Sequence, residues 1–266
     1  FGSLFVAAIS FPFFKKSMNF KTIYIASFLG YATHGLLDAC TSYGTLLFWP
    51  FSNVRIAWNN VSVVDPLFTV PALILVICAI IQKKRLYTAL ALTWCFLYLM
   101  LGFIQHERTY RAALEIANER QHSPQRLTLK PSFGNLILWK AVYEHEGRYH
   151  VDAIRTLRTT TWCSGESIEV FDYDKHIPTL DKNSQQGIDI ERFRWFSQDY
   201  LGYDYQSQLV ADIRYSMIPS QIRPMWGLRI NPAKNQREHA VWIASRNLDD
   251  EQLSLFKGML TGEHCR

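Results

Sequence analysis

Residues 31–66 read YATHGLLDACTSYGTLLFWPFSNVRIAWNNVSVVDP and lie between two apolar runs. The stretch begins inside the first run, where His34 and Asp38 stand four positions apart, and it ends at Asp65, where the second run starts. A turn-rich loop, which opens with Ser42-Tyr43-Gly44, separates them. Ionisable side chains at the edges of hydrophobic segments are costly to hold in or near a lipid bilayer, so they usually mark function. We therefore expect a membrane-associated site in this stretch.

The chain of 266 residues divides into an apolar half and a polar half. Only seven of the 28 Lys and Arg residues and two of the 23 acidic residues precede position 106, so the net charge of +5 arises in the apolar half. Apart from Arg55, these basic residues lie in two short segments, 15–21 and 83–85. Basic clusters between apolar runs are typical of membrane topology signals and not of a phosphate-binding face. We expect no nucleic-acid partner.

The apolar half predicts an α-helical membrane domain with about four transmembrane segments, the first of them truncated. The predicted segments are 1–14, 22–40, 62–81 and 86–104. A helix needs about 20 residues to cross the hydrocarbon core, so the first segment is interpreted as the tail of a longer helix. The positive-inside rule places the basic loops in the cytoplasm, and the loop 42–61 and everything after Gln105 on the other side. The sequence thus predicts a multi-pass protein with an extracytoplasmic C-terminal domain.

The polar half predicts a water-exposed α+β domain at 126–266, joined to the transmembrane domain at 1–105 by a juxtamembrane helix or linker at 106–125. Alternating residues on either side of Glu146-Gly147 are typical of a β-hairpin. Further strands, rich in β-branched and aromatic residues, are expected at 167–173, 207–216, 225–230 and 239–245. Helices are expected at 190–201 and 249–260, the second with Asn247 as its N-cap. Cys163 and Cys265 can form a disulfide if this domain faces an oxidising compartment.

His34 and Asp38 would project from one face of a helix, because residues four apart share a face. An imidazole and a carboxylate suit Zn²⁺, Mn²⁺ or Mg²⁺, and Asp65, on the same side of the membrane, could supply a third ligand. Three protein ligands and a water form the open site that hydrolytic metal enzymes use. A structural role is the alternative, since Asp65-Pro66 also fits an N-cap followed by proline in the first helical position. The residues alone leave both interpretations open.

Three further residues of the stretch are candidates for substrate binding: Thr41, Tyr43 and Arg55. Thr41 and Tyr43 could orient the substrate or the metal ligands. Arg55 is the only basic residue of its loop and could meet a phosphate or a lipid head group, although an isolated loop arginine is more often solvated.

His145, His150 and Asp152 also lie close together, within the predicted hairpin. Their spacing matches no standard metal motif, and a solvated hairpin is the expected outcome. The chain contains no GxGxxG, GxxxxGK[ST] or GxSxG pattern. This argues against a nucleotide cofactor and against an α/β-hydrolase serine.

The strings THGLLDACTSYGTLLFWPFS at 33–52 and VSVVDPLFT at 61–69 resemble the signature of the YdjM-like family. Its members are membrane-associated proteins described as metal-dependent hydrolases, some of them LexA-regulated. The polar half resembles the extension of the longer members at 135–143, 193–197 and 212–216. The family's other metal motif, an HRGxTHS-like segment, would precede an apolar run such as the one that starts at Phe1 and is missing from this chain. The resemblance therefore implies an inner-membrane protein that carries part of a divalent-metal site.

The resemblance and the residues together predict a membrane-bound, metal-dependent hydrolase. His34, Asp38 and Asp65 would hold the ion, and the metal-bound water would attack an ester or phosphoester. A site at the bilayer suggests a lipid or lipid-linked substrate. The alternative is a non-enzymatic membrane protein that presents a sensing or binding domain.

Overall fold

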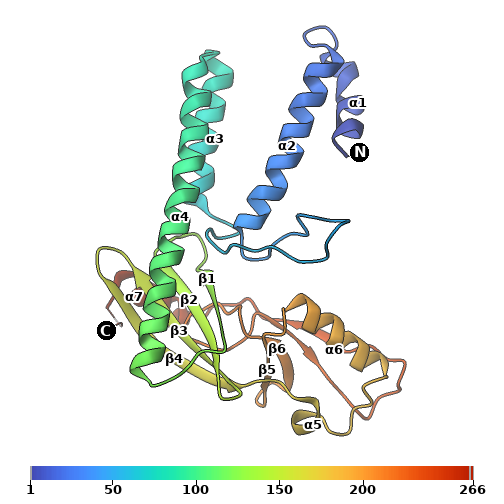
Figure 1. Ribbon diagram of the computed structural model, residues 1–266, viewed down its shortest axis with the longest axis vertical. Coiled ribbons are helices and arrows are strands. Elements are labelled where there is room, and N and C mark those ends of the chain that lie inside the picture. Colours follow the sequence, from blue (N-terminus) through green and yellow to red (C-terminus); the bar gives the residue numbers. More distant parts are fainter. Residues whose placement is uncertain (1, 264, 266) are drawn as a thin grey trace. The chain divides into compact units, whose positions relative to one another are not determined.

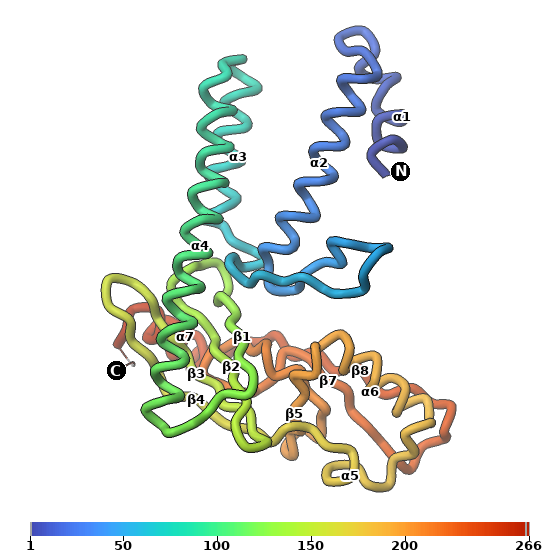
Figure 2. Tube along the Cα trace, viewed as in Figure 1, coloured from blue at the N-terminus to red at the C-terminus, as the bar shows by residue number. Residues whose placement is uncertain are grey.

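The computed structural model describes residues 2–263 and 265. It divides into two compact units, Phe1–Leu99 and Met100–Arg266, whose chain path is drawn in Figure 1 and Figure 2. Helix α4, Arg85–Glu119, begins in the first unit and ends in the second. The three predicted domains, 1–105, 106–125 and 126–266, stay a prediction.

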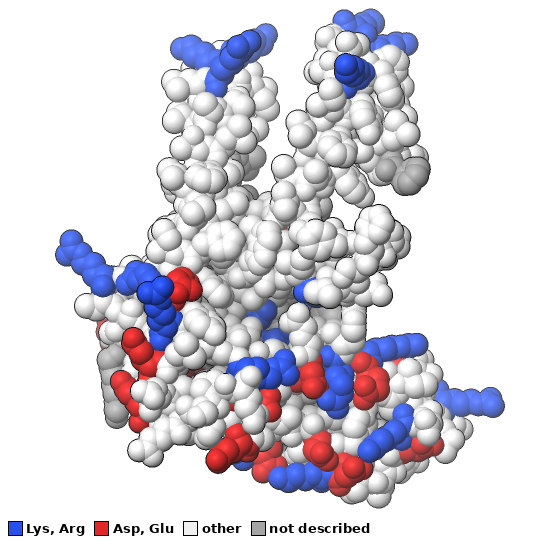
Figure 3. Space-filling model, viewed as in Figure 1, with Lys and Arg blue, Asp and Glu red and all other residues white. Residues whose placement is uncertain are grey.

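The N-terminal unit consists of α-helices and one long loop. Helix α1 covers Gly2–Phe14, α2 covers Phe20–Cys40 and α3 covers Pro66–Gln82. Asn19 caps α2, because its side chain accepts a hydrogen bond from the Thr22 amide. In Figure 3 the Lys and Arg side chains of this unit, apart from Arg55 of the long loop, gather where α1 meets α2 and where α3 meets α4, and the helices between them are uncharged on the visible face.

The prediction of about four transmembrane segments is wrong. Among the described residues only α4 is long and apolar enough to cross a membrane. Helices α1 and α3 have 13 and 17 residues; at about 1.5 Å per residue they fall short of the roughly 30 Å hydrocarbon core. Helix α2 has 21 residues, but Lys21, His34 and Asp38 lower its hydropathy. The predicted span at 62–81 was too long because Asp65 and Pro66 start the helix only there.

The first sheet of the C-terminal unit is an antiparallel meander of four strands. They are β1 Arg126–Pro131, β2 Leu138–His145, β3 Arg148–Thr156 and β4 Thr160–Glu169, in the order β1-β2-β3-β4. The predicted hairpin is confirmed, because β2 and β3 pair across a two-residue turn at Glu146-Gly147. Both turn residues have positive φ, 48° and 71°, as a tight hairpin turn requires. The end of α4 packs Ala113 and Ile116 against Trp139 and other buried residues of the sheet.

The second sheet consists of β5 Leu201–Asp204, β6 Leu209–Asp212, β7 Trp226–Arg229 and β8 Val241–Ala244, again in sequential order. The helices α5, Tyr173–His176, and α6, Gln185–Phe196, precede it in the chain. Phe193 of α6 and Trp226 of β7 belong to the hydrophobic core of this sheet. The two sheets meet where Val170, just after β4, pairs with Gly202 of β5.

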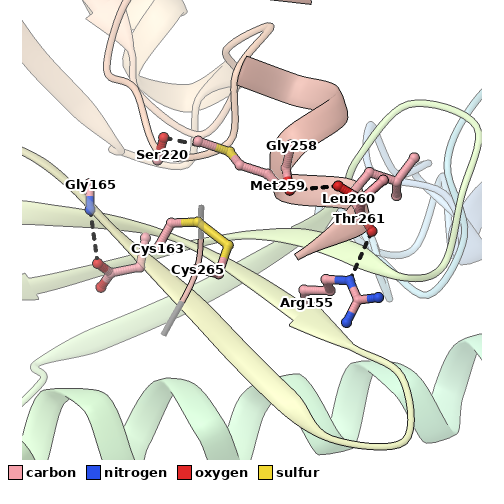
Figure 4. Close-up of a disulfide and its surroundings, with 10 residues drawn as sticks. Arg155, Cys163, Gly165, Ser220, Gly258, Met259, Leu260, Thr261 and Cys265 are labelled. Atoms are coloured by element: carbon pink, nitrogen blue, oxygen red, sulfur yellow. Dashed lines mark hydrogen bonds between the residues drawn. A yellow bond between two sulfur atoms is a disulfide. The ribbon is translucent and has the colours of Figure 1, made fainter. Parts of the chain in front are cut away.

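The chain ends in helix α7, Asp250–Thr261, which is tied to the first sheet. Its N-cap is Asp249 and not the predicted Asn247; Asp249 and Gln252 form a capping box. A disulfide joins Cys163 of β4 to Cys265, and the Arg155 side chain donates a hydrogen bond to the Leu260 carbonyl at 2.8 Å (Figure 4). These bonds hold the C-terminal segment against β3 and β4.

Candidate functional site

His34 and Asp38 lie together near the C-terminal end of α2, as their spacing predicted. The distance from His34 Nε2 to Asp38 Oδ2 is 3.5 Å. Both side chains are accessible, with exposed fractions of 72% and 45%. The pair therefore offers one imidazole nitrogen and one carboxylate to a ligand from solvent.

Asp65 has a different role, because both oxygens of its carboxylate are occupied. Oδ1 accepts hydrogen bonds from the amides of Leu67 and Phe68, at 3.1 and 3.2 Å, and so caps α3. Oδ2 accepts a hydrogen bond from the Tyr98 hydroxyl at 2.8 Å, and Asp65 is only 4% exposed. Within residues 2–263 and 265, no three or more His, Cys, Asp or Glu side chains are arranged to hold a metal ion. The structure thus brings together two of the three predicted ligands.

The three candidate substrate-binding residues belong to the end of α2 and to the loop that follows it. The Thr41 hydroxyl donates to the Asp38 carbonyl at 2.7 Å, and its amide binds the same oxygen at 3.0 Å. Arg55 donates to the Tyr43 carbonyl at 3.3 Å. These bonds account for part of the loop's shape; substrate binding by the three residues stays a prediction.

Three histidines of the C-terminal unit form a ring cluster that spacing alone did not reveal. His122 follows α4, His145 ends β2 and His150 lies in β3. The ring of His122 stacks on His145 with 4.3 Å between centroids and lies 4.5 Å from His150. The Tyr143 hydroxyl is 2.8 Å from His122 Nδ1. The hairpin histidines were visible in the sequence, but their contact with His122 depends on how α4 ends.

Two imidazoles of the cluster, those of His122 and His150, have lowered pKa values. Partial burial, and then the neighbouring His122 and Arg120, lower the pKa of His150 from 6.5 to about 4. The pKa of His122 is lowered as well, by desolvation and by His145 and Arg120. Arg120 lies beside the cluster and forms an ion pair with the buried Asp152, 2.7 Å apart. Because the His122 and His145 rings are stacked only 24° from parallel, their nitrogens do not converge on one point as metal ligands would.

A cavity of about 940 Å³ opens in the C-terminal unit. Its wall includes Arg223, Arg229, Gln221, Tyr203, Tyr205 and Trp226. The wall also contains Glu169, which forms ion pairs with Arg148 at 3.4 Å and with Lys175 at 2.7 Å. Arg223 and Arg229 are exposed and form no ion pair with any carboxylate of the described residues. The cavity is large enough for a small-molecule ligand.

The N-terminal helices expose many apolar side chains, α4 is long and apolar enough to cross a membrane, and the C-terminal unit is rich in β-strands. The family model of the YdjM inner membrane protein matches residues 1–109. The match supports a YdjM-like assignment over this range, as the resemblance implied, and with it an inner-membrane location. No curated protein and no solved structure matches the chain.

Proposed function

We propose that this protein anchors in the inner membrane and presents its C-terminal unit outside the cytoplasm as a ligand-binding domain. The observation that carries the proposal is the disulfide between Cys163 and Cys265. Disulfides persist in oxidising compartments such as the periplasm and are rare in the cytosol. The cavity of about 940 Å³ in the same unit supplies room for a ligand.

The charges at the start of α4 support the same orientation. Lys83, Lys84 and Arg85 stand at the N-terminal end of this helix, and the positive-inside rule keeps such a cluster in the cytoplasm. If α4 crosses the bilayer once, its other end emerges on the opposite side. The residues after Gln105 would then be extracytoplasmic.

Thiol labelling in intact cells tests this orientation. In a variant with Cys40, Cys78 and Cys95 changed to alanine, only Cys163 and Cys265 remain. We expect a polyethylene-glycol maleimide to label the denatured protein only after reduction, and external protease to digest the C-terminal unit in spheroplasts. Free thiols without reduction, together with protection from the protease, would place the unit in the cytoplasm and refute the proposal.

A second proposal is that His34 and Asp38 bind a divalent metal ion. Their distance of 3.5 Å and their exposure support it, and the two groups are ligands that Zn²⁺ and Mn²⁺ accept. They do not fit a complete hydrolytic site, which uses three protein ligands and a water, because Asp65 is committed to α3 and Tyr98. The His34–Asp38 pair by itself is therefore not a complete hydrolytic metal centre.

Metal analysis of the protein purified in detergent tests the pair. We expect His34→Ala and Asp38→Ala each to lower the bound metal relative to the unchanged protein. Lys21→Ala, at the other end of the same helix, is the matched control and should retain it. Equal metal content in all four proteins would remove the basis for the second proposal.

A further inference from the structure

A lysine is buried in the middle of the first sheet. Lys140 lies in β2, paired with Lys130 of β1 and Ala153 of β3, and is only 3% exposed. Its ammonium group has two hydrogen-bond acceptors at 2.7 Å, the Ser216 hydroxyl and the Gln221 carbonyl. Across the described part of the chain, no carboxylate lies within ion-pair distance of it. A charged amine in this position therefore lacks a compensating charge.

Burial of an amine without a counter-ion favours its neutral form. Desolvation lowers the pKa of Lys140 from 10.5 to about 7, although the more distant Glu166 and Asp212 oppose the shift. Near neutral pH a substantial fraction of this side chain is consequently a free amine. A free amine can accept a proton from the hydroxyl next to it.

Ser216 is the hydroxyl in question, and it is half-buried. Its Oγ accepts the bond from Lys140 and donates to the Ile218 carbonyl at 2.6 Å. When the lysine is neutral, rotation of the hydroxyl hydrogen redirects the donated bond to Nζ. A serine next to a neutral lysine is the arrangement of Ser-Lys hydrolases, in which the lysine replaces histidine as the general base.

The pair adjoins the large cavity of the C-terminal unit. Gln221, whose carbonyl binds Lys140, is part of the cavity wall, and so is Pro224, which pairs with Ser216 in an isolated antiparallel bridge. Gln221 and Pro224 are thus the wall residues through which the Ser216–Lys140 pair adjoins the cavity.

We propose that Ser216 is a nucleophile activated by Lys140, and that the C-terminal unit hydrolyses carboxylic esters bound in the adjoining cavity. The proposal concerns a site separate from His34 and Asp38, and it rests on the proposed ligand-binding function because it uses the same cavity. Esters are the expected class because an alkoxide leaves more readily than an amine and needs less activation.

The reaction balances without a further reactant except water. Ser216 Oγ attacks the ester carbonyl carbon while its proton passes to Lys140 Nζ. The carbon–oxygen bond to the alcohol then breaks, and Nζ returns the proton to the departing oxygen. Water attacks the resulting acyl-serine, gives one proton to Nζ and releases the carboxylic acid. The proton on Nζ finally restores the Ser216 hydroxyl.

A purely structural role is the competing explanation, because both bonds also satisfy a buried amine. Covalent labelling separates the two explanations. We would treat the detergent-purified protein with a fluorophosphonate probe and locate the adduct by peptide mass spectrometry. The expected adduct is on Ser216, and it should form faster at pH 8 than at pH 6. Absence of a Ser216 adduct on the folded protein at either pH would overturn the proposal, and this result does not depend on any variant.

Ester hydrolysis supplies the second measurement, with p-nitrophenyl acetate as the substrate. Ser216→Ala and Lys140→Met should each reduce the rate by about 100-fold or more, in the range for loss of a nucleophile or general base. Ser254→Ala is the control and should keep the rate, since Ser254 is an exposed serine of α7 that does not line the cavity. Unchanged rates in a folded Ser216→Ala variant, judged by circular dichroism, would also overturn the proposal.

Discussion

Asp65 shows how one carboxylate can organise a helix start inside an apolar environment. It satisfies the two amides of Leu67 and Phe68 and also receives the hydroxyl of Tyr98 from α4. A buried carboxylate with several donors is stable, whereas one that gives up those donors carries a large desolvation cost. Recruiting Asp65 to a metal would break these bonds, which is why it fits a structural role.

Substitution of Asp65 should destabilise the N-terminal unit. Asp65→Ala removes an N-cap and the partner of Tyr98, for an expected loss of about 2 kcal/mol. Tyr98→Phe removes only one hydrogen bond and should cost about 1 kcal/mol. Thermal unfolding in detergent measures both. If Tyr98→Phe destabilised the unit more than Asp65→Ala does, this result would contradict the proposed capping role of Asp65.

Gly165 is a second position where a small change in the side chain should affect stability, because the backbone leaves no room for a Cβ atom. A Cβ at this residue would overlap the backbone carbonyl oxygens of Val151 and Ser220. Backbone cannot move aside as a flexible side chain can, so overpacking here is expensive.

The matched comparison is Gly147, where a Cβ would meet nothing within 4 Å but φ is +71°. Gly147→Ala should cost about 1 kcal/mol through its left-handed backbone. Gly165→Ala should cost at least about 2 kcal/mol more. Urea unfolding, monitored by tryptophan fluorescence, compares the Gly147→Ala and Gly165→Ala variants. Equal midpoints would show that β4 can shift away from Ser220.

Sequence patterns predicted single residues unevenly. The i,i+4 spacing correctly placed His34 beside Asp38, because a helix fixes that geometry locally. Asp65-Pro66 was equally readable as a helix start, and that alternative is the one the hydrogen bonds support. Lys140 and Ser216 gave no signal at all, since 76 positions separate them and only the packed fold brings them together.

At the scale of elements, the histidine cluster packs the turn after α4 against the β2–β3 hairpin. His122 contributes from the turn, and His145 and His150 from the two strands. Two charged side chains act on the cluster, those of Arg120 and of Glu146 in the hairpin turn. Arg120 also forms an ion pair with Asp152 of β3. Protonating the histidines places like charges in ring contact.

The lowered pKa values of His122 and His150 predict that acid weakens the contact between the turn after α4 and the β2–β3 hairpin. Well above pH 6.5, His122 and His150 are neutral in the folded and the unfolded chain. As the pH falls below 6.5, the unfolded chain binds protons that the folded cluster resists, so stability decreases until the folded sites titrate too, near pH 4 for His150. The melting temperature of the C-terminal unit should fall over this window.

His150→Gln separates this effect from the titration of carboxylates. The variant keeps a polar side chain that does not titrate, so its melting temperature should fall less between pH 6.5 and pH 4 than that of the unchanged protein. His239→Gln is the control, because His239 pairs with Asp189 and is remote in sequence from the cluster. Parallel pH curves for all three proteins would contradict the prediction.

Elements were predictable where the pattern is local. The β2–β3 hairpin follows from alternation on either side of Glu146-Gly147, and the terminal helix was expected close to its observed bounds, although its N-cap is Asp249 and not Asn247. Membrane spans were not predictable in this way, because hydropathy identifies apolar runs but does not show where a helix begins. Asp65 and Lys83 bound α3 to a length that no apolar count reveals.

At the scale of the whole molecule, the disulfide depends on long-range packing. The cysteines are 102 residues apart, and the sequence offered their pairing only as a conditional outcome. Around the bond, Met259 of α7 packs with Leu138 and Ile218, so the end of the chain completes a hydrophobic cluster. The C-terminal segment is thus part of the core of its unit.

Removing this cross-link should substantially destabilise the C-terminal unit. Closing a loop of about 100 residues restricts the unfolded chain by an amount worth about 4.7 kcal/mol, and loss of a native disulfide typically costs about 2–5 kcal/mol. For a unit of this size the melting temperature of Cys163→Ser should fall by roughly 10 °C. Reductant should lower the melting temperature of the unchanged protein and leave that of the variant alone.

Cys78→Ser controls for the loss of a thiol, since Cys78 is free and lies in α3. It should melt like the unchanged protein and respond equally to reductant. If reductant had no effect on either protein, the C-terminal unit would not depend on an oxidised cross-link. The argument for its extracytoplasmic location would then lose its main support, because a unit stable without the bond could fold equally well in the cytosol.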